Sequence, residues 1–308
     1  MKFIAQGLIR PVKKFLNNSY VLLFLNGFFF AALVLFYTEG DYESKIFQRL
    51  AEEIRDHHSA GPLTEDSLLV RSLHLTNALE KNRSVIFGKR QVSSFKSDFL
   101  QPLTVDLMTG QQACGGFSYV LGRILSELDI QYRFAQMRVN GVFGGHIIVE
   151  AKMPYGWVVL DPLYDLYFKR PDGKLASFAD VQLNWAYYGK QVPAGYKMNY
   201  RYEAVRYTNW DKIPVVMPAL KGMMKFAIGA EKTENFSFRN LVLRKFDLYI
   251  SITLSIYLFL LSLVVRKYIR RIERAKKMRA EILFPRHAEV PQPIESIPCN
   301  PVSFTHDF

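Results

Sequence analysis

The apolar residues of the chain gather in two long runs that contain no charged side chain. These runs are residues 20–37 (YVLLFLNGFFFAALVLFY) and 248–265 (LYISITLSIYLFLLSLVV), each eighteen residues long. At ~1.5 Å per residue, a helix of this length spans ~27 Å, close to the thickness of a bilayer hydrocarbon core. Both runs are apolar on every face, unlike the one-sided stripe of a helix in a soluble core. We therefore predict two transmembrane helices, and we expect the first to be an uncleaved anchor because no small-residue cleavage site follows it.

The segment between the two runs has the patterns of a folded α+β domain. Two helices are predicted first, in KIFQRLAEEIRDHH and in TEDSLLVRSLHLTNALEKN. A third, amphipathic helix of about fourteen residues begins at Cys114, because apolar residues recur at helical spacing from Phe117 onwards. Three strands follow, in QYRFAQMRV, from His146 to Glu150 and from Trp157 to Leu160. The turns between them are short, which predicts an antiparallel sheet.

Charge is spread unevenly over these parts. The 308-residue chain has 40 Lys and Arg residues against 28 Asp and Glu residues, a formal charge of +12. Residues 1–38 hold four basic and no acidic side chains, residues 39–246 hold 27 and 22, and residues 247–308 hold nine and six. The middle segment is therefore close to an ordinary soluble domain. Two cysteines exclude a disulfide scaffold, and the absence of a basic groove interleaved with aromatic residues argues against nucleic-acid binding.

The basic flanks of the two runs predict how the chain crosses the membrane. Four basic residues precede the first run, and eight follow the second run with one Glu among them. By the positive-inside rule, residues 1–19 and 266–308 lie in the cytoplasm and the domain of residues 38–247 lies outside it, in the periplasm of a cell (inner) membrane protein. Arg244 and Lys245, just before the second run, argue weakly for the opposite orientation and are outnumbered.

The segment after the second run is basic and then rich in proline. Its first part is predicted to continue as a helix along the membrane surface that attracts anionic lipid, although a role in setting topology alone explains the charges equally well. From Pro285 onwards, five prolines predict a disordered cytoplasmic tail, which contains Cys299.

Three residues in the domain have the chemistry and the order needed to activate a thiol. Cys114 is predicted at a helix N-terminus, where free N–H groups and the helix dipole favour the thiolate. His146 opens one predicted strand and Asp161 ends the next, so antiparallel pairing brings the imidazole and the carboxylate side by side. An imidazole can take a thiol proton, and a carboxylate can orient the imidazole. Cys114 is also the only cysteine of the domain, so it has no intradomain disulfide partner.

Each of these residues also has an ordinary structural explanation. A lone cysteine is often a small buried hydrophobe, a histidine before Ile-Ile-Val can be a core residue, and Asp-Pro is a common turn. His57, His58 and His74 lie on predicted helices without a second cluster of ligands, and we expect them to be surface or hydrogen-bonded side chains. No cofactor, metal site or calcium loop is predicted.

The motif around the three residues resembles the transglutaminase-like superfamily, a papain-like group. The matching residues are Gln112, Ala113, Cys114 and Gly115, then Gly145 and His146, then Gly156, Trp157, Leu160, Asp161 and Pro162. This resemblance implies a papain-like fold with N-terminal helices, a Cys at a helix start and an antiparallel sheet, here between two transmembrane helices. It also implies that Cys114 is the nucleophile, that His146 is the general base and acid, and that Asp161 is the orienting carboxylate.

Other positions of the motif are less certain in their roles. Gln111 or Gln112 is a candidate oxyanion donor with the Cys114 backbone N–H, and a helix cap is the open alternative. Gly115, Trp157, Tyr164 and Asp165 are further candidates for the cleft, while the aromatic segment after them forms either a groove or a packed core. The chain departs from many relatives at the second and fourth positions after the cysteine and lacks the Trp beside it, so the resemblance does not imply true protein cross-linking.

These features together predict a membrane-anchored cysteine acyl-transfer enzyme of the cell envelope. It would act outside the cytoplasm as an amide or peptide hydrolase or as a transglutaminase-type transferase, on a protein, a peptide or an envelope polymer. Hydrolysis and transamidation both stay open, because the first needs only water and the second needs a bound amine. The alternative is a non-catalytic transglutaminase-like module that binds envelope assembly partners in a polymer or polysaccharide pathway.

Overall fold

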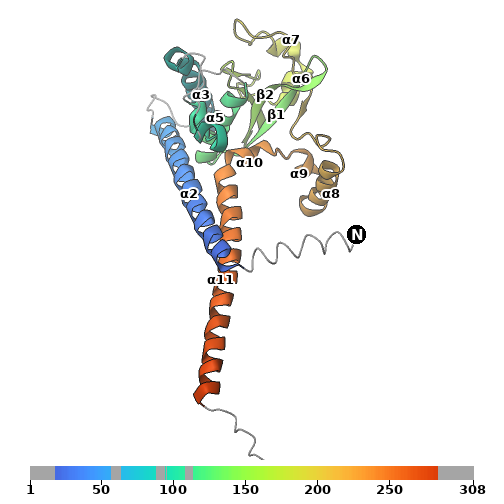
Figure 1. Ribbon diagram of the computed structural model, residues 1–308. Coiled ribbons are helices and arrows are strands. Elements are labelled where there is room, and N and C mark those ends of the chain that lie inside the picture. Colours follow the sequence, from blue (N-terminus) through green and yellow to red (C-terminus); the bar gives the residue numbers. More distant parts are fainter. Residues whose placement is uncertain (1–17, 57–63, 88–93, 95, 108–113, 284–308) are drawn as a thin grey trace, which may run out of the picture. The chain divides into compact units, whose positions relative to one another are not determined.

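A computed structural model describes residues 18–56, 64–87, 94, 96–107 and 114–283 (Figure 1). The chain forms two compact units, of which the larger is Ala31–Leu254 and the smaller comprises the described residues of Met1–Phe30 and Ser255–Phe308. In the smaller unit, two helical segments contact each other: Arg271 Nη2 donates to Ser19 Oγ at 3.2 Å, and the rings of Phe30 and Tyr257 lie 6.1 Å apart.

Two long helices contain the two apolar runs. Helix α2 (Ser19–Asp56) has 38 residues and α11 (Lys245–Leu283) has 39, and both are long and apolar enough to cross a membrane. Helix formation over both runs is thus confirmed, and the chain has two candidate membrane spans. The first helix predicted in the domain is not a separate element, because its described part continues α2 without a break. The basic run after the second span is also helical, as predicted, and continues α11.

The larger unit is an α+β structure built on one antiparallel sheet. Its five strands follow the order β4-β3-β2-β1-β5. The strands are β1 (Tyr132–Val139), β2 (Val142–Met153), β3 (Gly156–Asp161), β4 (Leu166–Tyr167) and β5 (Val205–Arg206). The helical elements are α3 (Glu65–Phe87), the π-helical turn η1 (Lys96–Leu100), α4 (Leu103–Asp106), α5 (Cys114–Glu127), α6 (Phe178–Leu183), α7 (Trp185–Tyr188), α8 (Val216–Ile228), α9 (Ala230–Glu234) and α10 (Arg239–Leu243).

Strands β1 and β2 form a hairpin that is longer than the sequence pattern predicts. Asn140 and Gly141 connect them with φ angles of 50° and 81°, as a tight turn of two left-handed residues requires. This turn lets Val139 pair directly with Val142, so β2 begins four residues before His146. The prediction that His146 opens its strand is therefore wrong. A bulge between Met137 and Arg138 interrupts the register opposite this part of β2.

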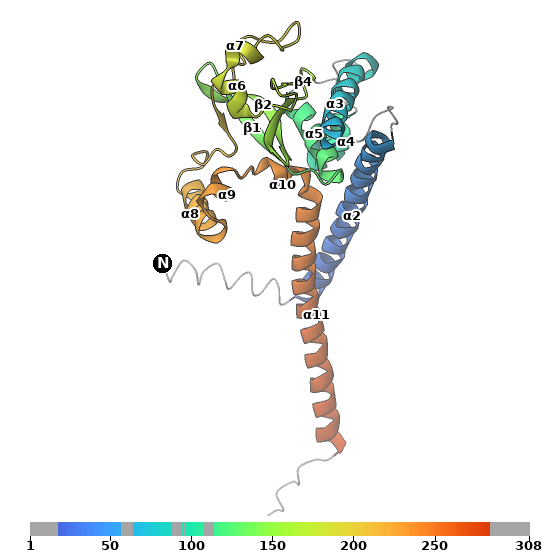
Figure 2. The same ribbon diagram turned by 180° about the vertical axis from the view of Figure 1, so that it is seen from behind.

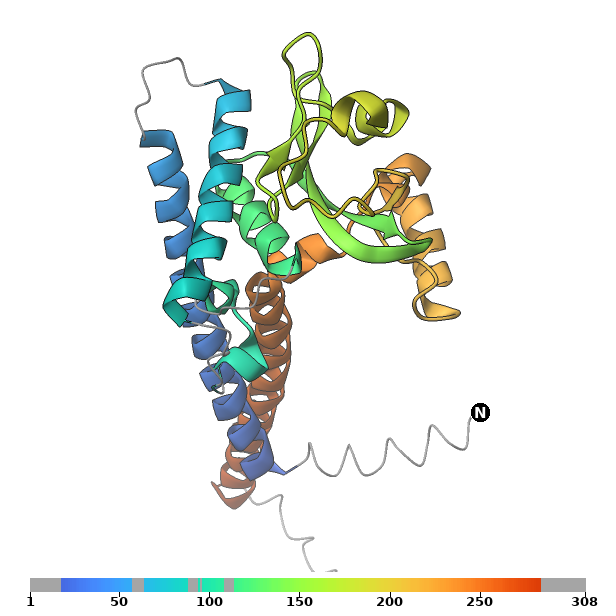
Figure 3. The same cartoon turned by 90° about the horizontal axis from the view of Figure 1, so that it is seen from above.

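Apolar side chains pack on both faces of the sheet, and the view from above shows helices on either side of it (Figure 3). On one face, α5 packs its buried residues against Val149 and Leu160. A Cβ atom on Gly122 of α5 would lie only 2.7 Å from Phe134 Cζ, so glycine permits this close approach. On the other face, Ile148 and Val159 pack with α6 and with a group of tyrosines. The view from behind shows the same order of α3, α5 and the sheet (Figure 2).

Candidate active site

His146 and Asp161 form a fully buried pair at one end of the sheet. Nε2 of His146 lies 2.6 Å from Oδ2 of Asp161, and neither residue is exposed to solvent. The β2–β3 ladder ends where Val149 pairs with Leu160; Asp161 is the next residue of β3, and His146 precedes Val149 by three residues on β2, where it pairs with Met137 of β1. The second carboxylate oxygen, Oδ1, accepts a hydrogen bond from the Leu163 backbone N–H at 3.2 Å. The sequence prediction that antiparallel strands bring these two residues together is confirmed.

Cys114 is the first residue of α5 and is half-buried. Helix α5 is fixed to β2 near this end, because Ser118 Oγ donates to the Ile147 carbonyl oxygen at 3.0 Å. The backbone of Ile147 also forms a hydrogen bond to the Cys114 sulfur. The thiol therefore lies beside the strand residue that follows His146. Its predicted place at a helix N-terminus is confirmed.

The electrostatics of the three residues couple the thiol to the imidazole. Burial disfavours the charged forms of both groups, yet interaction with His146 lowers the pKa of the Cys114 thiol. Burial likewise opposes the imidazolium, but the charge and hydrogen bond of Asp161, together with Cys114, raise the pKa of His146 to about 9. The Nδ1 atom of His146 is buried and has no hydrogen-bond partner among the described residues, so it remains available to take up a proton. The two opposite pKa shifts favour the pair of a thiolate and an imidazolium over the neutral pair.

Tyrosines fix the plane of the His146 ring. The ring of Tyr200 stacks on His146 at 4.4 Å between centroids and 16° between planes. Tyr164 meets His146 edge-on at 6.1 Å and lies 4.7 Å from Tyr196, whose hydroxyl donates to the Tyr200 carbonyl oxygen. The sequence predicts Tyr164 near Cys114, His146 and Asp161, which we call the triad, but it does not predict Tyr196 and Tyr200 there. The only sequence signal for these two residues is the high density of tyrosines in this segment.

Helix α3 holds the loop that follows Asp161. Asn77 Nδ2 donates to the carbonyl oxygens of Pro162 at 2.9 Å and Leu163 at 3.2 Å. One turn earlier on α3, His74 Nδ1 lies 2.7 Å from Oδ1 of Asp165. The expectation that His74 is a hydrogen-bonded side chain is confirmed, whereas His57 and His58 lie outside the described residues. Asp165, a cleft candidate, is thus directed to α3 and is not paired with the triad.

The remaining residues predicted to line the cleft lie in different parts of the structure. Trp157 is at the opposite end of β3 from Asp161, ~13 Å away at ~3.3 Å per residue, and its ring lies against the Arg133 guanidinium. The structure therefore does not bring Trp157 to the triad. Gly115 follows Cys114 in α5, and a Cβ atom there would lie 4.0 Å from Ile147 Cδ1. Gln111 and Gln112 lie outside the described residues. No group of three or more metal-ligating side chains occurs in the part of the chain that the structure describes.

The site has the parts needed for nucleophilic chemistry at a thiol. Its cysteine is half-buried, its proton acceptor is buried and its carboxylate is fixed by two hydrogen bonds. Compared with known proteins, the chain has no significant match to a family model, a curated protein or a solved structure. The geometry of these residues is therefore the basis for inferring what the protein does.

Proposed function

We propose that this chain is a membrane-anchored cysteine acyl-transfer enzyme with a papain-like, transglutaminase-like domain. The observation that carries the proposal is the buried 2.6 Å pair of His146 and Asp161 beside the half-buried thiol that begins α5. A buried His–Asp pair is costly to desolvate, and a core packed with apolar residues would not need it. The pair has a clear purpose where an imidazole must hold and release a proton next to a nucleophile.

The reaction follows from the protonation states of the site. The Cys114 thiolate attacks the carbonyl carbon of an amide or ester, and the S–C bond forms as the carbonyl π electrons move onto oxygen. His146 Nδ1 gives its proton to the leaving amine or alcohol as the C–N or C–O bond breaks. A thioester on Cys114 remains. Water or an amine then loses a proton to Nδ1 and attacks the thioester, which releases the product and restores the thiolate and imidazolium.

The basic flanks of the two spans support an orientation for this enzyme. We propose that both termini are cytoplasmic and that the domain between the spans lies outside the cytoplasm, where its substrates are envelope proteins, peptides or polymers. Protease added outside intact spheroplasts should then digest the domain and spare epitope tags at both ends. Protection of the domain would contradict this orientation.

The experiment that tests the function is capture of the acyl intermediate in whole envelopes. Membranes containing the full chain are treated with hydroxylamine, which cleaves thioesters, and the released acyl fragments and the Cys114 peptide are identified by mass spectrometry. We expect an acyl fragment from the wild type and from Cys299→Ala, a matched control that retains the proposed nucleophile. We expect none from Cys114→Ala.

The opposite result would favour a binding module. If no fragment is released and a folded Cys114→Ala protein fully restores the phenotype of a deletion strain, the thiol has no chemical role. The fold would then serve to hold a partner in envelope assembly.

A further inference from the structure

A cavity of about 430 Å³ lies beside α5 and β5, and its charges are all of one sign. Three cationic side chains, Arg206, Lys212 and Arg239, line it together with neutral residues, and no Asp or Glu is among the lining residues that the structure describes. A volume of this size accommodates a chemical group larger than a simple ion.

No carboxylate among the described residues forms an ion pair with any of the three cations. Within this part of the chain, Arg206 donates to two neutral oxygens, those of Gln136 at 3.3 Å and Phe143 at 3.4 Å. Arg239 Nη1 donates to the hydroxyl of Tyr119, and its buried Nε has no partner among the described residues. Gathering like charges is unfavourable, and so is a buried donor that makes no hydrogen bond. A bound anion removes both costs, because a guanidinium forms paired hydrogen bonds with carboxylate or phosphate.

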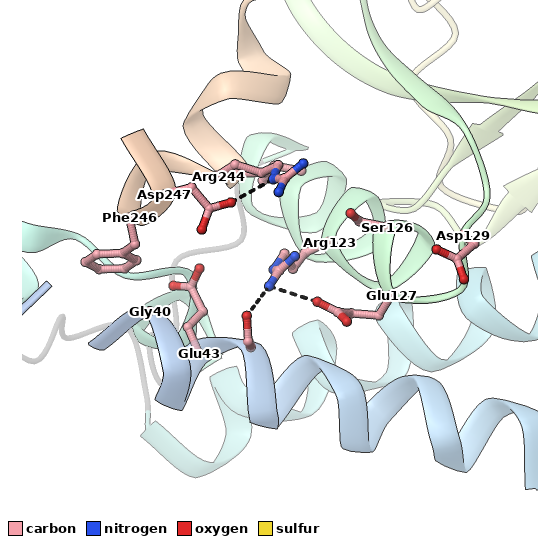
Figure 4. A pocket seen from close by; sticks show the side chains of 11 residues that line it. Gly40, Glu43, Arg123, Ser126, Glu127, Asp129, Arg244, Phe246 and Asp247 are labelled. Carbon is pink, nitrogen blue, oxygen red and sulfur yellow. Dashed lines mark hydrogen bonds and ion pairs between the residues drawn. The ribbon is translucent and has the colours of Figure 1, made fainter. Parts of the chain in front are cut away.

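In a second cavity of the same domain, carboxylates neutralise the cations. This cavity, of about 410 Å³, lies at the C-terminal end of α5 (Figure 4). There Arg123 pairs with Glu127 at 2.8 Å, and Arg244 pairs with Asp247 at 2.8 Å. Both arginines thus have a carboxylate from a nearby position in the sequence. The absence of such carboxylates around the first cavity is therefore a local feature and not a general property of this domain.

One wall of the cationic cavity is formed by α5, the helix that begins with the candidate nucleophile. Two of its walls are Tyr119 and Gln136. A Cβ atom on Gly115, the residue after Cys114, would lie 3.9 Å from the Tyr119 ring and 4.0 Å from Ile147. Gln136 in turn pairs with Ile147 across the β1–β2 ladder. Along the helix axis of α5, the backbone positions of Cys114 and Tyr119 are offset by ~7.5 Å, at a rise of ~1.5 Å per residue.

We infer that this cavity binds an anionic group, a carboxylate or a phosphate, carried by the substrate that acylates Cys114. The inference rests on the proposed function and specifies its substrate class: an acyl compound that carries a negative charge close to the reacting carbonyl group. Arg206 and Arg239 bind the anion, and Lys212, which also lines the cavity, adds to the attractive field.

The test compares three thiol probes on the full-length protein in detergent. All share an iodoacetamide head and an ethyl spacer, and they end in a carboxylate, a phosphate or a neutral carboxamide. We expect one acidic probe to alkylate Cys114 on the order of ten-fold faster than the neutral probe, and the faster of the two identifies the anion. Arg206→Gln combined with Arg239→Gln should remove this preference and leave the rate of the neutral probe unchanged. Lys190→Gln, which removes an exposed cation that does not line the cavity, should keep the preference.

The outcomes separate this inference from the proposed function. If all three probes react at the same high rate with the wild type, or if the double variant keeps the preference, the anion site is wrong while the activated thiol stands. If the neutral probe reacts with the wild type no faster than with an ordinary thiol, the proposed function fails as well. Should the double variant not fold, competition is measured on the wild type instead, where phosphate or succinate must slow the acidic probe more than an equal ionic strength of sodium chloride does.

Discussion

The domain contains two histidine–aspartate pairs of nearly equal length in very different surroundings. His146 and Asp161 are 2.6 Å apart and fully buried, whereas His74 and Asp165 are 2.7 Å apart with side chains 49% and 33% exposed. Among the residues that the structure describes, only the buried pair has a thiol beside it. The exposed pair joins α3 to the loop after Asp161, and water screens its charges, so it is worth at most about 1 kcal/mol. The distance between a histidine and an aspartate therefore does not define a catalytic pair, because burial and a third reactive group decide its chemistry.

The largest expected difference between the pairs concerns the reactivity of Cys114. His146→Ala should lower the rate of Cys114 alkylation at pH 7 roughly ten- to thirty-fold, since a thiol with an ordinary pKa near 8.5 is only a few per cent ionised there. The matched variant His74→Ala should leave the rate unchanged. Mass spectrometry of the Cys114 peptide after timed exposure to iodoacetamide measures both. Equal rates in the wild type and the two variants would mean that the buried pair does not activate the thiol.

A smaller effect should distinguish the two carboxylates. Asp161→Asn leaves an oxygen that can accept the hydrogen bond from Nε2 but removes the charge that stabilises the imidazolium, so the pKa of His146 falls and Cys114 loses part of its thiolate. We expect a loss of alkylation rate of about three- to ten-fold at pH 7, between those of the wild type and His146→Ala. Asp165→Asn should have no effect on this rate. A loss in Asp165→Asn as large as in Asp161→Asn would remove the distinction between the pairs.

Local sequence patterns predicted the elements that carry the triad. The apolar spacing after Cys114 predicts α5, and the alternation around the Asn140-Gly141 turn predicts β1 and β2, because both patterns reflect contacts between near neighbours. The pairing of His74 with Asp165 spans 91 residues and has no local pattern. The sequence motif of Trp157 ends in Asp161 and therefore favours a place for Trp157 at the cleft. In the structure, the length of β3 separates the two residues, which lie at opposite ends of this strand.

The smallest expected effect is on stability as a function of pH. The pKa of His146 is raised from 6.5 to about 9 in the folded state. Folding is therefore favoured by its protonation below pH 6.5, and this contribution is lost as the pH rises through the folded-state pKa. In a Cys114→Ser background, where this thiol does not titrate, thermal unfolding midpoints should fall as the pH rises above 6.5. Adding His146→Ala should flatten that slope, and adding His74→Ala should retain it. If the unfolding midpoint still falls with rising pH after His146→Ala, the pH dependence arises from other titrating groups.

The most direct test of the account is the pH dependence of Cys114 alkylation by iodoacetamide in the full-length protein. The protein carries Cys299→Ala, so that Cys114 is the only thiol of the chain. We predict a rate that is already high at neutral pH, with its rise below the pKa of ~8.5 of a free thiol, and a second inflection at about pH 9 where His146 loses its proton. A single rise at or above the pKa of a free thiol would contradict the thiolate–imidazolium pair on which the proposed function depends.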